Sequence, residues 1–465
     1  MSSTSTPMFN PNPKYSLCDL SIVPAIVSNI ESRSECNVYY EHDRLPIFTA
    51  PMDSVVDNKN YDIFNDSNIT PIIHRNVCLD ERIRLTKNGL WCAYRLTEFE
   101  DIFCNESSDI YNDAETYYNE NAEVTEIYAL IDVANGHMSK IFELAKKAKS
   151  AAKSRNVYLC LMAGNIANPE TYNVYCDAGI DYVRCSIGTG SMCLTTANTA
   201  IGYSNASLIM EIAKIREEYI ARQKNLGNNE IFLTKVIADG GIRNFSDVVV
   251  ALACGADYVM IGGLFASFID SCAMFNTEDR NIMNITKGYC SNYDEENKLY
   301  TFILPHSIDT ENGVFLTKDA YELIYYRCGL NHSPETICVN DQYPAPKWVV
   351  QIKLSMDEIH THEDVKKFLL KYADLSKSSH GMSSKEAQIN SLVSQGEKID
   401  KSKLKTSEGK TINGNVRYTC KQWTDNFESY LKSAMSYTNH KYIEDFIGNV
   451  QLVVRSYGTS LSVNK

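Results

Sequence analysis

The chain has 465 residues, a formal net charge of −13 and a sequence pI of about 5.3. This acidic balance argues against a nucleic-acid or anionic-membrane partner, because either partner would favour a basic face. No run of about 18 apolar residues is present, so no transmembrane helix is expected. The polar start MSSTSTPMFNPNPKYS lacks the basic and apolar regions of a secretory signal.

The 15 cysteines form no C-x-x-C pair, which excludes zinc-ribbon and thioredoxin-like sites. Scattered cysteines of this kind are typical of reduced thiols in a cytoplasmic protein.

Eight short apolar runs recur along the chain, each followed by a polar or glycine-containing turn. They are PIFTAPM (46–52), NITPIIHR (68–75), LWCAYRL (90–96), EIYALIDVA (126–134), NVYLCLMAGN (156–165), DYVRCSI (181–187), TKVIADGG (234–241) and DYVMIGGLF (257–265). Helical stretches lie between several of them, at 138–154, 170–179, 207–223 and 246–256. This alternation is typical of parallel strands in βα units. Eight units predict an α/β fold, a (β/α)8 TIM barrel, with an open doubly wound sheet as the alternative.

The character of the sequence changes after the eighth run. Residues 267–379 contain charged, tyrosine-rich and asparagine-rich stretches, and they predict an α+β insertion of unknown function. Residues 380–415 are polar and lysine-rich without an apolar period, which favours a mobile flap. A closing amphipathic helix is predicted over 424–446. The expected division is therefore 1–266 for the barrel and N-terminal arm, 267–379 for the insertion, and 380–465 for the flap and closing helix.

Three glycine-containing loops at predicted strand ends could hold a phosphate group on backbone amides. They are GTGS (188–191), Gly240–Gly241 and Gly262–Gly263. Asp239 could accept the two hydroxyls of a ribose, or it could cap the following helix. Cys193 lies among amides in the first loop, where a nucleophilic role competes with simple packing.

Other polar residues at the strand ends leave similar alternatives open. Thr195 could relay a proton or begin a helix, and Asp132 in DVANGH, near Asn135 and His137, could orient an amide or belong to a turn. The group His74-Arg75-Asn76 could bind an anionic substrate or be solvated. Glu408 would matter only if the predicted flap closes over a substrate.

Taken together, these motifs resemble the IMP dehydrogenase/GMP reductase family. The matching segments are SRSEC, TAPMDSV, IIHRN, DVANGH, AGNIANPE, GTGSMCLT, IADGGIRNFSDVVVALACGADYVMIGG, HGMSSKEA and SEGKT. The resemblance implies a barrel enzyme that acts on a purine nucleoside monophosphate with a nicotinamide cofactor, NADPH or NAD. It implies that Cys193 attacks purine C2 to form a thioimidate.

The resemblance also assigns the remaining site residues. The 5′-phosphate would be held by Ser191, Gly240, Gly241, Gly262 and Gly263, the ribose by Asp239, and the base by Gly381, Met382 and Ser383. The cofactor would lie near Asp132, Asn165 and Arg184. A monovalent cation, K⁺, would lie at the carbonyl groups of Gly188, Gly190 and Cys193.

Within the family, the motifs favour GMP reductase over IMP dehydrogenase or a divergent purine-nucleotide enzyme. No arginine occurs between 380 and 415, so the Arg-Tyr pair by which the dehydrogenase activates water is missing. In the reductase, the residues corresponding to Glu408 and Thr195 would pass a proton to the departing ammonia.

Four features depart from that pattern. Arg75 occupies a catalytic position at which GMP reductases usually carry a lysine. A guanidinium cannot release a proton there as a lysine can. His380 replaces a tyrosine, Lys405 replaces an arginine, and the insertion is foreign to both subfamilies. The family further implies a homotetramer. An alternative of another class is a catalytically lapsed barrel that binds nucleotide and signals through its insertion.

Overall fold

The protein is described from a computed structural model. The structure describes residues 12–112, 116–119, 122–190, 194–275, 375–382, 384–394 and 409–455. Between residues 275 and 375 it describes residues 367 and 370 and the backbone of four strands. In this part of the chain no helix combines the length and apolar character needed to cross a bilayer.

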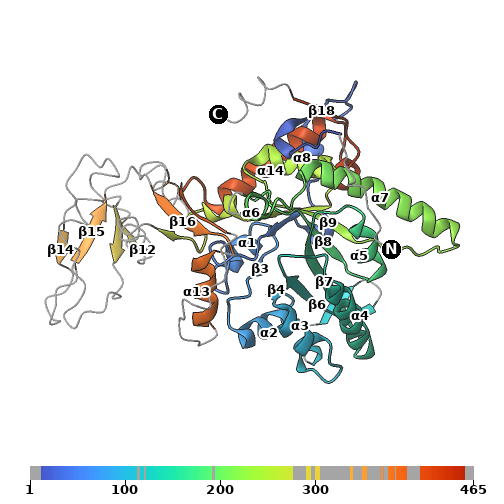
Figure 1. Ribbon diagram of the computed structural model, residues 1–465. Helices are drawn as coiled ribbons and strands as arrows, with labels where there is room; N and C mark the ends of the chain where they lie inside the picture. The colour runs from blue at the N-terminus through green and yellow to red at the C-terminus, as the bar shows by residue number, and fades with distance from the viewer. Residues whose placement is uncertain are drawn as a thin grey trace.

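Eight parallel strands form a closed barrel (Figure 1). They are β2 (Ile47–Thr49), β3 (Ile72–Ile73), β4 (Trp91–Tyr94), β6 (Ala122–Asp132), β7 (Val157–Ile166), β8 (Tyr182–Cys185), β9 (Lys235–Asp239) and β10 (Tyr258–Ile261). Their order in the sheet is β2-β10-β9-β8-β7-β6-β4-β3. A parallel bridge between Phe48 and Thr70 joins the two ends of this order. The predicted barrel and all eight predicted strands are therefore confirmed, and the open-sheet alternative is wrong.

Aromatic side chains fill the interior of the barrel. Rings of Phe48, Trp91, Tyr182 and Tyr258 come from four different strands, with centroid distances of 5.0 Å for Phe48–Tyr258, 5.5 Å for Trp91–Tyr182 and 5.6 Å for Tyr182–Tyr258. These residues are buried. Because side chains alternate across a strand, this closely packed layer fixes which residues further along each strand also point inward.

Helices cover the outside of the barrel. They are α1 (Tyr61–Asn65), α2 (Leu79–Lys87), α3 (Leu96–Phe103), α4 (Ser139–Ser154), α5 (Thr171–Asp177), α7 (Asn205–Asn225), α8 (Phe245–Ala253), α9 (Gly263–Ala266), α14 (Cys420–Tyr437) and α15 (Ile443–Phe446). The short helix α6 (Thr195–Thr199) follows β8 and has no buried residue. The alanines at 145, 148, 151 and 152 in α4 are buried against the sheet. The fully buried Trp423 on α14 packs against Phe265 and Phe268 after β10, so the C-terminal helix closes the barrel layer.

Three local features differ from the sequence-based expectation. The closing helix predicted over 424–446 is two helices, because α14 ends at Tyr437 and Asn439 adopts a left-handed backbone conformation with φ of 61°. A further strand, β5 (Thr116–Asn119), pairs antiparallel with the start of β6. The stretch 380–415, predicted to lack regular structure, contains α13 (Lys385–Ser394) and β17 (Thr411–Asn415).

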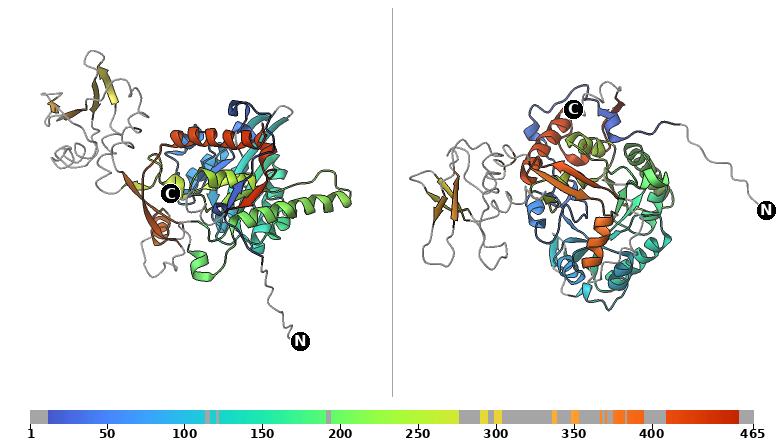
Figure 2. Two further views of the ribbon diagram at one scale, coloured as in Figure 1. Left: turned by 90° about the horizontal axis from the view of Figure 1, so that it is seen from above. Right: turned by 60° about the vertical axis from the view of Figure 1, so that its left-hand side comes forward.

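A small antiparallel sheet connects the barrel to the insertion. It consists of β11 (Met274–Phe275), β16 (Ser376–His380) and β17. The antiparallel pair of strands β16 and β17 lies across one end of the barrel together with α13, which comes between them in the chain (Figure 2, right). Within the insertion, β12 (Cys290–Asp294), β13 (Leu299–Ile303), β14 (Thr336–Cys338) and β15 (Trp348–Ile352) form a four-stranded antiparallel sheet to one side of the barrel (Figure 1).

Candidate active site

A pocket of about 320 Å³ lies at the carboxyl ends of the barrel strands. This volume is at the lower end of the range of about 300–1,000 Å³ that is usual for small-molecule sites. Its lining residues are Ala50, Pro51, Met52, Arg75, Asp132, Val133, Ala134, Asn165, Arg184, Ser186, Ile187, Gly188, Gly190, Thr195, Asp239, Gly240, Gly241, Ile242, Met260, Gly262, Gly263, Gly381, Met382 and Gly409. The carboxyl ends of the strands are where enzymes with this fold build their sites.

Three charged side chains enter the pocket because of the strand period of two. Asp132, Arg184 and Asp239 each come two residues after an inward-facing apolar residue, which are Leu130, Tyr182 and Ile237 respectively. Along β6, β8 and β9, the side chains that face the barrel interior therefore change from apolar to charged over two residues.

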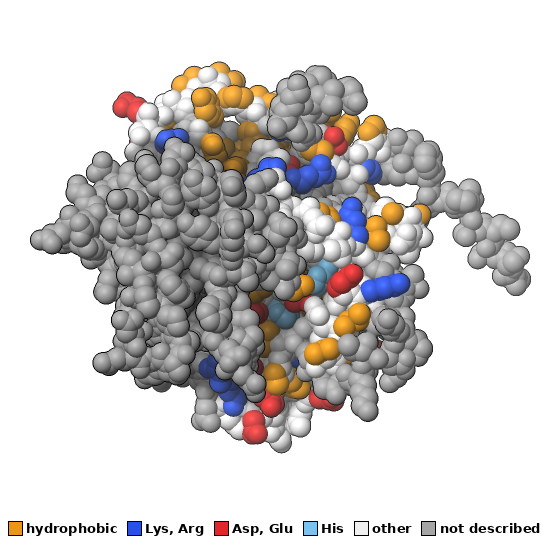
Figure 3. Space-filling model, turned by 90° about the vertical axis from the view of Figure 1, so that its left-hand side faces the viewer, with side chains coloured by type: hydrophobic (Ala, Val, Ile, Leu, Met, Phe, Trp, Pro, Cys, Tyr) orange, Lys and Arg blue, Asp and Glu red, His pale blue; other side chains and the backbone are white. Residues whose placement is uncertain are grey.

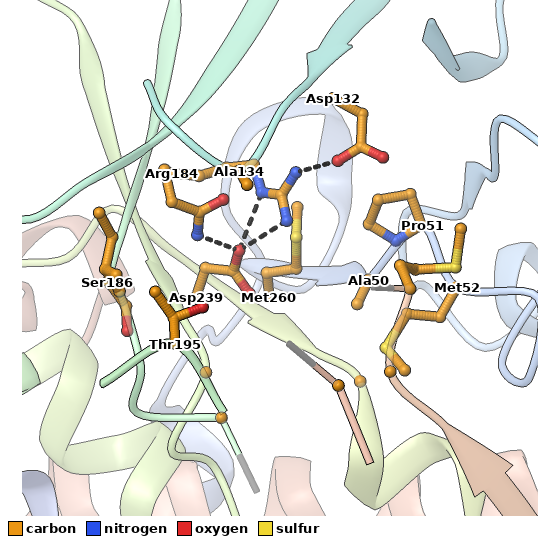
Figure 4. A pocket seen from close by; sticks show the side chains of 18 of the residues that line it. Ala50, Pro51, Met52, Asp132, Ala134, Arg184, Ser186, Thr195, Asp239 and Met260 are labelled. Atoms are coloured by element: carbon orange, nitrogen blue, oxygen red, sulfur yellow. Dashed lines mark hydrogen bonds and ion pairs between the residues drawn. The ribbon is translucent and has the colours of Figure 1, made fainter. Parts of the chain in front are cut away.

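Arg184 links the two carboxylates of this charged layer (Figure 4). Its Nη1 donates to Oδ1 of Asp132 at 2.9 Å, its Nε donates to Oδ2 of Asp239 at 2.9 Å, and its Nη2 lies 2.8 Å from the same oxygen. Burial alone would lower the pKa of Arg184, but Asp239 and Asp132 raise it. The guanidinium is thus held as a fixed positive charge between two strands.

A glycine on the intervening strand makes this link possible. In the sheet register Asp132 pairs with Gly164 of β7, and Gly164 pairs with Arg184 of β8. A Cβ on Gly164 would lie 2.6 Å from Cβ of Arg184 and 2.7 Å from its carbonyl oxygen. Any larger residue at position 164 would therefore displace the strand that carries Arg184.

Asp132 also contacts a second arginine. Arg75 donates from Nη1 to the main-chain oxygen of Asp132 at 3.0 Å and lies 3.4 Å from its Oδ2. Burial would raise the pKa of Asp132, but Arg75 and Arg184 outweigh it and lower that pKa. Asp132 is therefore a stable carboxylate, and a carboxylate with two oxygens has acceptor capacity beyond these two contacts.

Asp239 is positioned by Asn165 as well as by Arg184. The Nδ2 atom of Asn165 donates to Oδ2 of Asp239 at 2.7 Å. All the contacts just given for Asp239 use this one oxygen, and the side chain lines the pocket (Figure 4). The second oxygen, Oδ1, takes part in none of these contacts.

The predicted phosphate loops border the same pocket. Gly188, Gly190, Gly240, Gly241, Gly262 and Gly263 all line it. At Gly262 a Cβ would lie 2.8 Å from Sδ of Met52 and 3.2 Å from Cβ of Ala50. The lack of a side chain at Gly262 therefore lets the loop after β2 approach the loop after β10.

Four of the predicted site residues lie outside the described residues: Ser191, Cys193, Ser383 and Glu408. The remaining fourteen all line the pocket. They are Arg75, Asp132, Asn165, Arg184, Gly188, Gly190, Thr195, Asp239, Gly240, Gly241, Gly262, Gly263, Gly381 and Met382. The structure thus brings together predicted residues from six of the eight strand ends and from the segment after β16.

His74, Asn76, Asn135 and His137 do not line the pocket. Nε2 of His137 accepts the N–H of Ala167 at 3.1 Å, so its Nδ1 carries the proton and donates to Oγ1 of Thr171 at 3.0 Å. Burial lowers the pKa of His137, which favours this neutral form. His137 therefore ties the loop after β6 to the loop after β7 and has a structural role.

The residues that the sequence reasoning did not single out are mostly apolar. Ala50, Pro51 and Met52 follow β2, Val133 and Ala134 follow β6, and Met260 is the inward residue two positions before Gly262. Their position within the apolar runs, toward the carboxyl ends, was the available signal. They supply flat apolar surface beside the charged layer, as expected for a site that binds a planar ring.

No group of three or more histidine, cysteine, aspartate or glutamate side chains suited to a metal ion occurs among the residues that the structure describes. The pocket charges are instead paired with one another. The cations Arg75 and Arg184 lie against the anions Asp132 and Asp239, so the described part of the pocket is close to neutral.

Comparison with known proteins gives one family. The family model described as "IMP dehydrogenase / GMP reductase domain" matches residues 18–299. A GMP reductase from Caenorhabditis elegans is 28% identical over 273 residues, 56% of this chain and 69% of the relative. A GMP reductase from Oceanobacillus iheyensis is 28% identical over 259 residues, which cover 54% of this chain and 71% of the relative. An inosine-5′-monophosphate dehydrogenase from Aquifex aeolicus is 35% identical over 137 residues, 30% of this chain and 24% of the relative.

Proposed function

Because the chain belongs to the IMP dehydrogenase/GMP reductase family of purine-nucleotide oxidoreductases, we propose that it is a GMP reductase, which reduces GMP with NADPH to IMP and ammonia. The observation that carries the proposal is the single pocket that unites the charged layer, the three glycine loops and the segment after β16. The similarity to GMP reductases over more than half of this chain supports the choice of reaction.

The purine nucleotide would lie across the barrel mouth. The amides of Gly240, Gly241, Gly262 and Gly263, with Ser191, would hold the 5′-phosphate. Amides suit this task because Arg75 and Arg184 already have carboxylate partners and are not free to neutralise a phosphate.

The ribose and the base would be bound on either side of that loop region. Oδ1 of Asp239 would accept the ribose hydroxyls, while Arg184 and Asn165 hold the carboxylate by its other oxygen. Gly381, Met382 and Ser383 would line the base.

The cofactor would lie beside Asp132, Asn165 and Arg184. Apolar Val133 and Ala134 lie next to the ionised Asp132 at the pocket edge, which suits a flat ring that carries a carboxamide. NADPH, or NADH in its place, supplies the hydride when it is bound. In this arrangement Asp132 would accept the carboxamide N–H groups, and Arg75 would hold Asp132 in the charged state needed to do so.

The covalent step would fall to Cys193. Its thiolate would attack C2 of the purine and form a C–S bond, and the C2–N bond would break as the protonated amino group leaves as ammonia. A hydride added at C2 would then break the C–S bond, which releases IMP and restores the Cys193 thiolate. Thr195, which begins α6 and lines the pocket, would pass that proton from Glu408. Arg75 cannot exchange protons at ordinary pH, so its part is that of a fixed charge.

Three further expectations belong to the same proposal. K⁺ would be coordinated by the main-chain oxygens of Gly188, Gly190 and Cys193, the enzyme would be a homotetramer, and it would act in the cytoplasm. Activity in potassium compared with sodium buffers, and light scattering of the purified protein, test the first two.

The decisive experiment follows the absorbance of the reduced nicotinamide with two substrate pairs. Loss of absorbance with GMP and NADPH, release of ammonia and loss of both in Cys193→Ala would support the reductase. Gain of absorbance with IMP and NAD⁺ would instead make the protein an IMP dehydrogenase, the alternative that the segment similar to the Aquifex aeolicus enzyme favours. No signal with either pair would overturn both readings.

Thiol labelling provides a second readout of Cys193. Among the described cysteines Cys78 is exposed, whereas Cys92, Cys160, Cys185 and Cys254 are buried. Cys18, Cys104 and Cys272 are partly exposed, so iodoacetamide labelling in a Cys78→Ser background is read by mass spectrometry of the peptide that contains Cys193, and GMP should slow the labelling of that peptide. Unchanged labelling with saturating GMP would contradict the placement of Cys193 at the purine.

A further inference from the structure

Asp53 connects the loop after β2 with two elements that follow the insertion. Nε2 of His380, the last residue of β16, lies 3.0 Å from Oδ1 of Asp53. Nδ2 of Asn390, on α13, donates to Oδ2 of Asp53 at 3.1 Å. One carboxylate therefore contacts β16 with one oxygen and α13 with the other.

The contact between Asp53 and His380 depends on charge. Their side chains are 11% and 13% exposed. Oδ1 and Nε2 are shielded from solvent, and neither has an aligned hydrogen bond with any described residue. The two atoms are close enough for a charge-assisted contact, and the attraction strengthens when the imidazole carries a positive charge. It is strong when the imidazole is protonated and weak when it is neutral.

The neighbours of this pair in the chain form two walls of the pocket. Ala50–Met52 immediately precede Asp53, and Gly381–Met382 immediately follow His380. In the space-filling view, histidine and acidic side chains gather in a hollow beside the residues drawn in grey (Figure 3). We propose that Asp53 and charged His380 are a positioning pair that holds these two walls together, so that the affinity of the pocket for its nucleotide depends on the protonation of His380. The inference rests on the proposed function only in taking that ligand to be a purine nucleotide.

A second anchor limits the effect to the end of the strand. Lys377, three residues before His380 on β16, is buried and donates from Nζ to the main-chain oxygens of Phe268, Ile269 and Ser271 at 2.7, 3.0 and 2.9 Å. These contacts hold the middle of β16 whether or not His380 is charged. Loss of the pair should therefore release the segment from position 380 onward and leave the strand in place.

The groups around the pair set the pH range in which it holds. The contact with Asp53 raises the pKa of His380 and outweighs burial, and Glu386 on α13 raises it further. Burial would raise the pKa of Asp53, but His380 and Asn390, with His74 after β3, lower it.

Four other titratable or charged groups face this region. Burial lowers the pKa of His74, so that imidazole is neutral near pH 7. Asp57, in the same loop as Asp53, faces both His74 and the thiol of Cys272, whose pKa burial raises to about 12. Lys377 also acts on Cys272 from β16.

The sign of the pH effect follows. The raised pKa of His380 means that its contribution is complete below about pH 6.5, its unfolded value, and is lost as the pH rises through the folded value. The lowered pKa of Asp53 means that its contribution is lost only in strong acid. The two pocket walls should therefore separate as the pH rises above the folded-state pKa of His380.

The first test measures GMP and IMP binding by titration calorimetry, and KM and kcat, between pH 6 and 9. His380→Gln keeps a polar side chain without the charge, and Asp53→Asn removes the other partner. His440→Gln is the matched control, because His440 pairs with Thr438 and does not line the pocket. Each variant is compared with the unmodified protein at the same pH, since the phosphate of the nucleotide itself titrates near pH 6.

We expect His380→Gln and Asp53→Asn to weaken nucleotide binding about tenfold at pH 6 and hardly at all at pH 9, with KM affected more than kcat. The double variant should be no weaker than either single variant, because the two residues act as one unit. A His380→Gln protein that binds like the unmodified protein at pH 6 would overturn the proposal.

The second test needs no ligand. At pH 6, where His380 is charged, hydrogen exchange of the peptide covering 380–394 should be several-fold faster in both variants than in the unmodified protein. Exchange around 268–271 should be unchanged. If the unmodified protein bound neither nucleotide, the proposed function would fail, and the exchange measurement would still decide the positioning pair. Equal exchange in all proteins would overturn it.

Discussion

Replacing Arg184 with methionine would remove the guanidinium group that lies between Asp132 and Asp239. Methionine has a similar length and no charge, so the change removes the ion pairs while keeping most of the side-chain volume. The two carboxylates would then face each other in a site where Asp132 is 9% exposed and Arg184 8%. The three nitrogen–oxygen contacts of 2.8–2.9 Å would be lost together.

Removing one partner of a buried ion pair costs about 3–5 kcal/mol, because the remaining charge is left without compensation. At about 2 °C per kcal/mol, the smaller end of the range for large domains, Arg184→Met should lower the melting temperature by roughly 6–10 °C at pH 7. The lowered pKa of Asp132 means that its contribution is present above about pH 4 and lost below it. The difference between the two proteins should therefore shrink in acid.

The matched control is Lys214→Met, which removes the cation of the exposed Lys214–Glu218 pair on α7. Those side chains are 76% and 65% exposed at a distance of 3.7 Å, so the change should cost less than about 0.5 kcal/mol. Scanning calorimetry of both variants provides the comparison. If Arg184→Met melted within 2 °C of Lys214→Met, on the same scale of about 2 °C per kcal/mol, the argument that the charged layer is held by Arg184 would be refuted.

Three other outcomes follow from single contacts. Trp423→Ala should cost about 3–5 kcal/mol in urea unfolding, because a fully buried indole leaves a cavity; a loss below about 1 kcal/mol would contradict its place in the core. Gly262→Ala should keep the circular dichroism spectrum but weaken nucleotide binding about tenfold, since its Cβ would meet Met52; an unchanged dissociation constant would show that the loop has room. Glu98→Gln should cost about 2 kcal/mol at pH 7, because Arg82 donates to both oxygens of Glu98 at 3.0 and 3.1 Å. Arg82 contributes to lowering the pKa of Glu98, so this loss should vanish as the pH falls below about 4, and a pH-independent loss would point to another cause.

Much of the barrel could be predicted because its signals are local. Each strand is a short apolar run that ends at a glycine or a polar residue, and burial on both faces of a parallel sheet requires such a run. The position of Asp132 and Asp239 at the ends of these runs was visible for the same reason. Even the inward direction of Arg184 follows from its spacing of two residues after Tyr182.

The breaks in regular structure could not be predicted in this way. The closing helix ends at Tyr437, although the apolar pattern of the sequence continues to residue 446. The hairpin strand β5 and the helix α13 lie in polar stretches, where composition favours a loop. In these places contacts with the rest of the molecule outweigh local preference.

The sequence by itself determined the eight barrel strands, their order along the chain and the residues at their carboxyl ends, because these depend on the alternation of apolar and polar side chains along a few residues. The tertiary structure alone decided which of those residues touch. Arg184 reaches Asp132 only because the sheet register places Gly164 between them. His380 meets Asp53 only because β16 returns from a long insertion to the end of the barrel. Such contacts join residues that are far apart in the chain, and closure of the barrel, register and packing fix them, none of which a local pattern encodes.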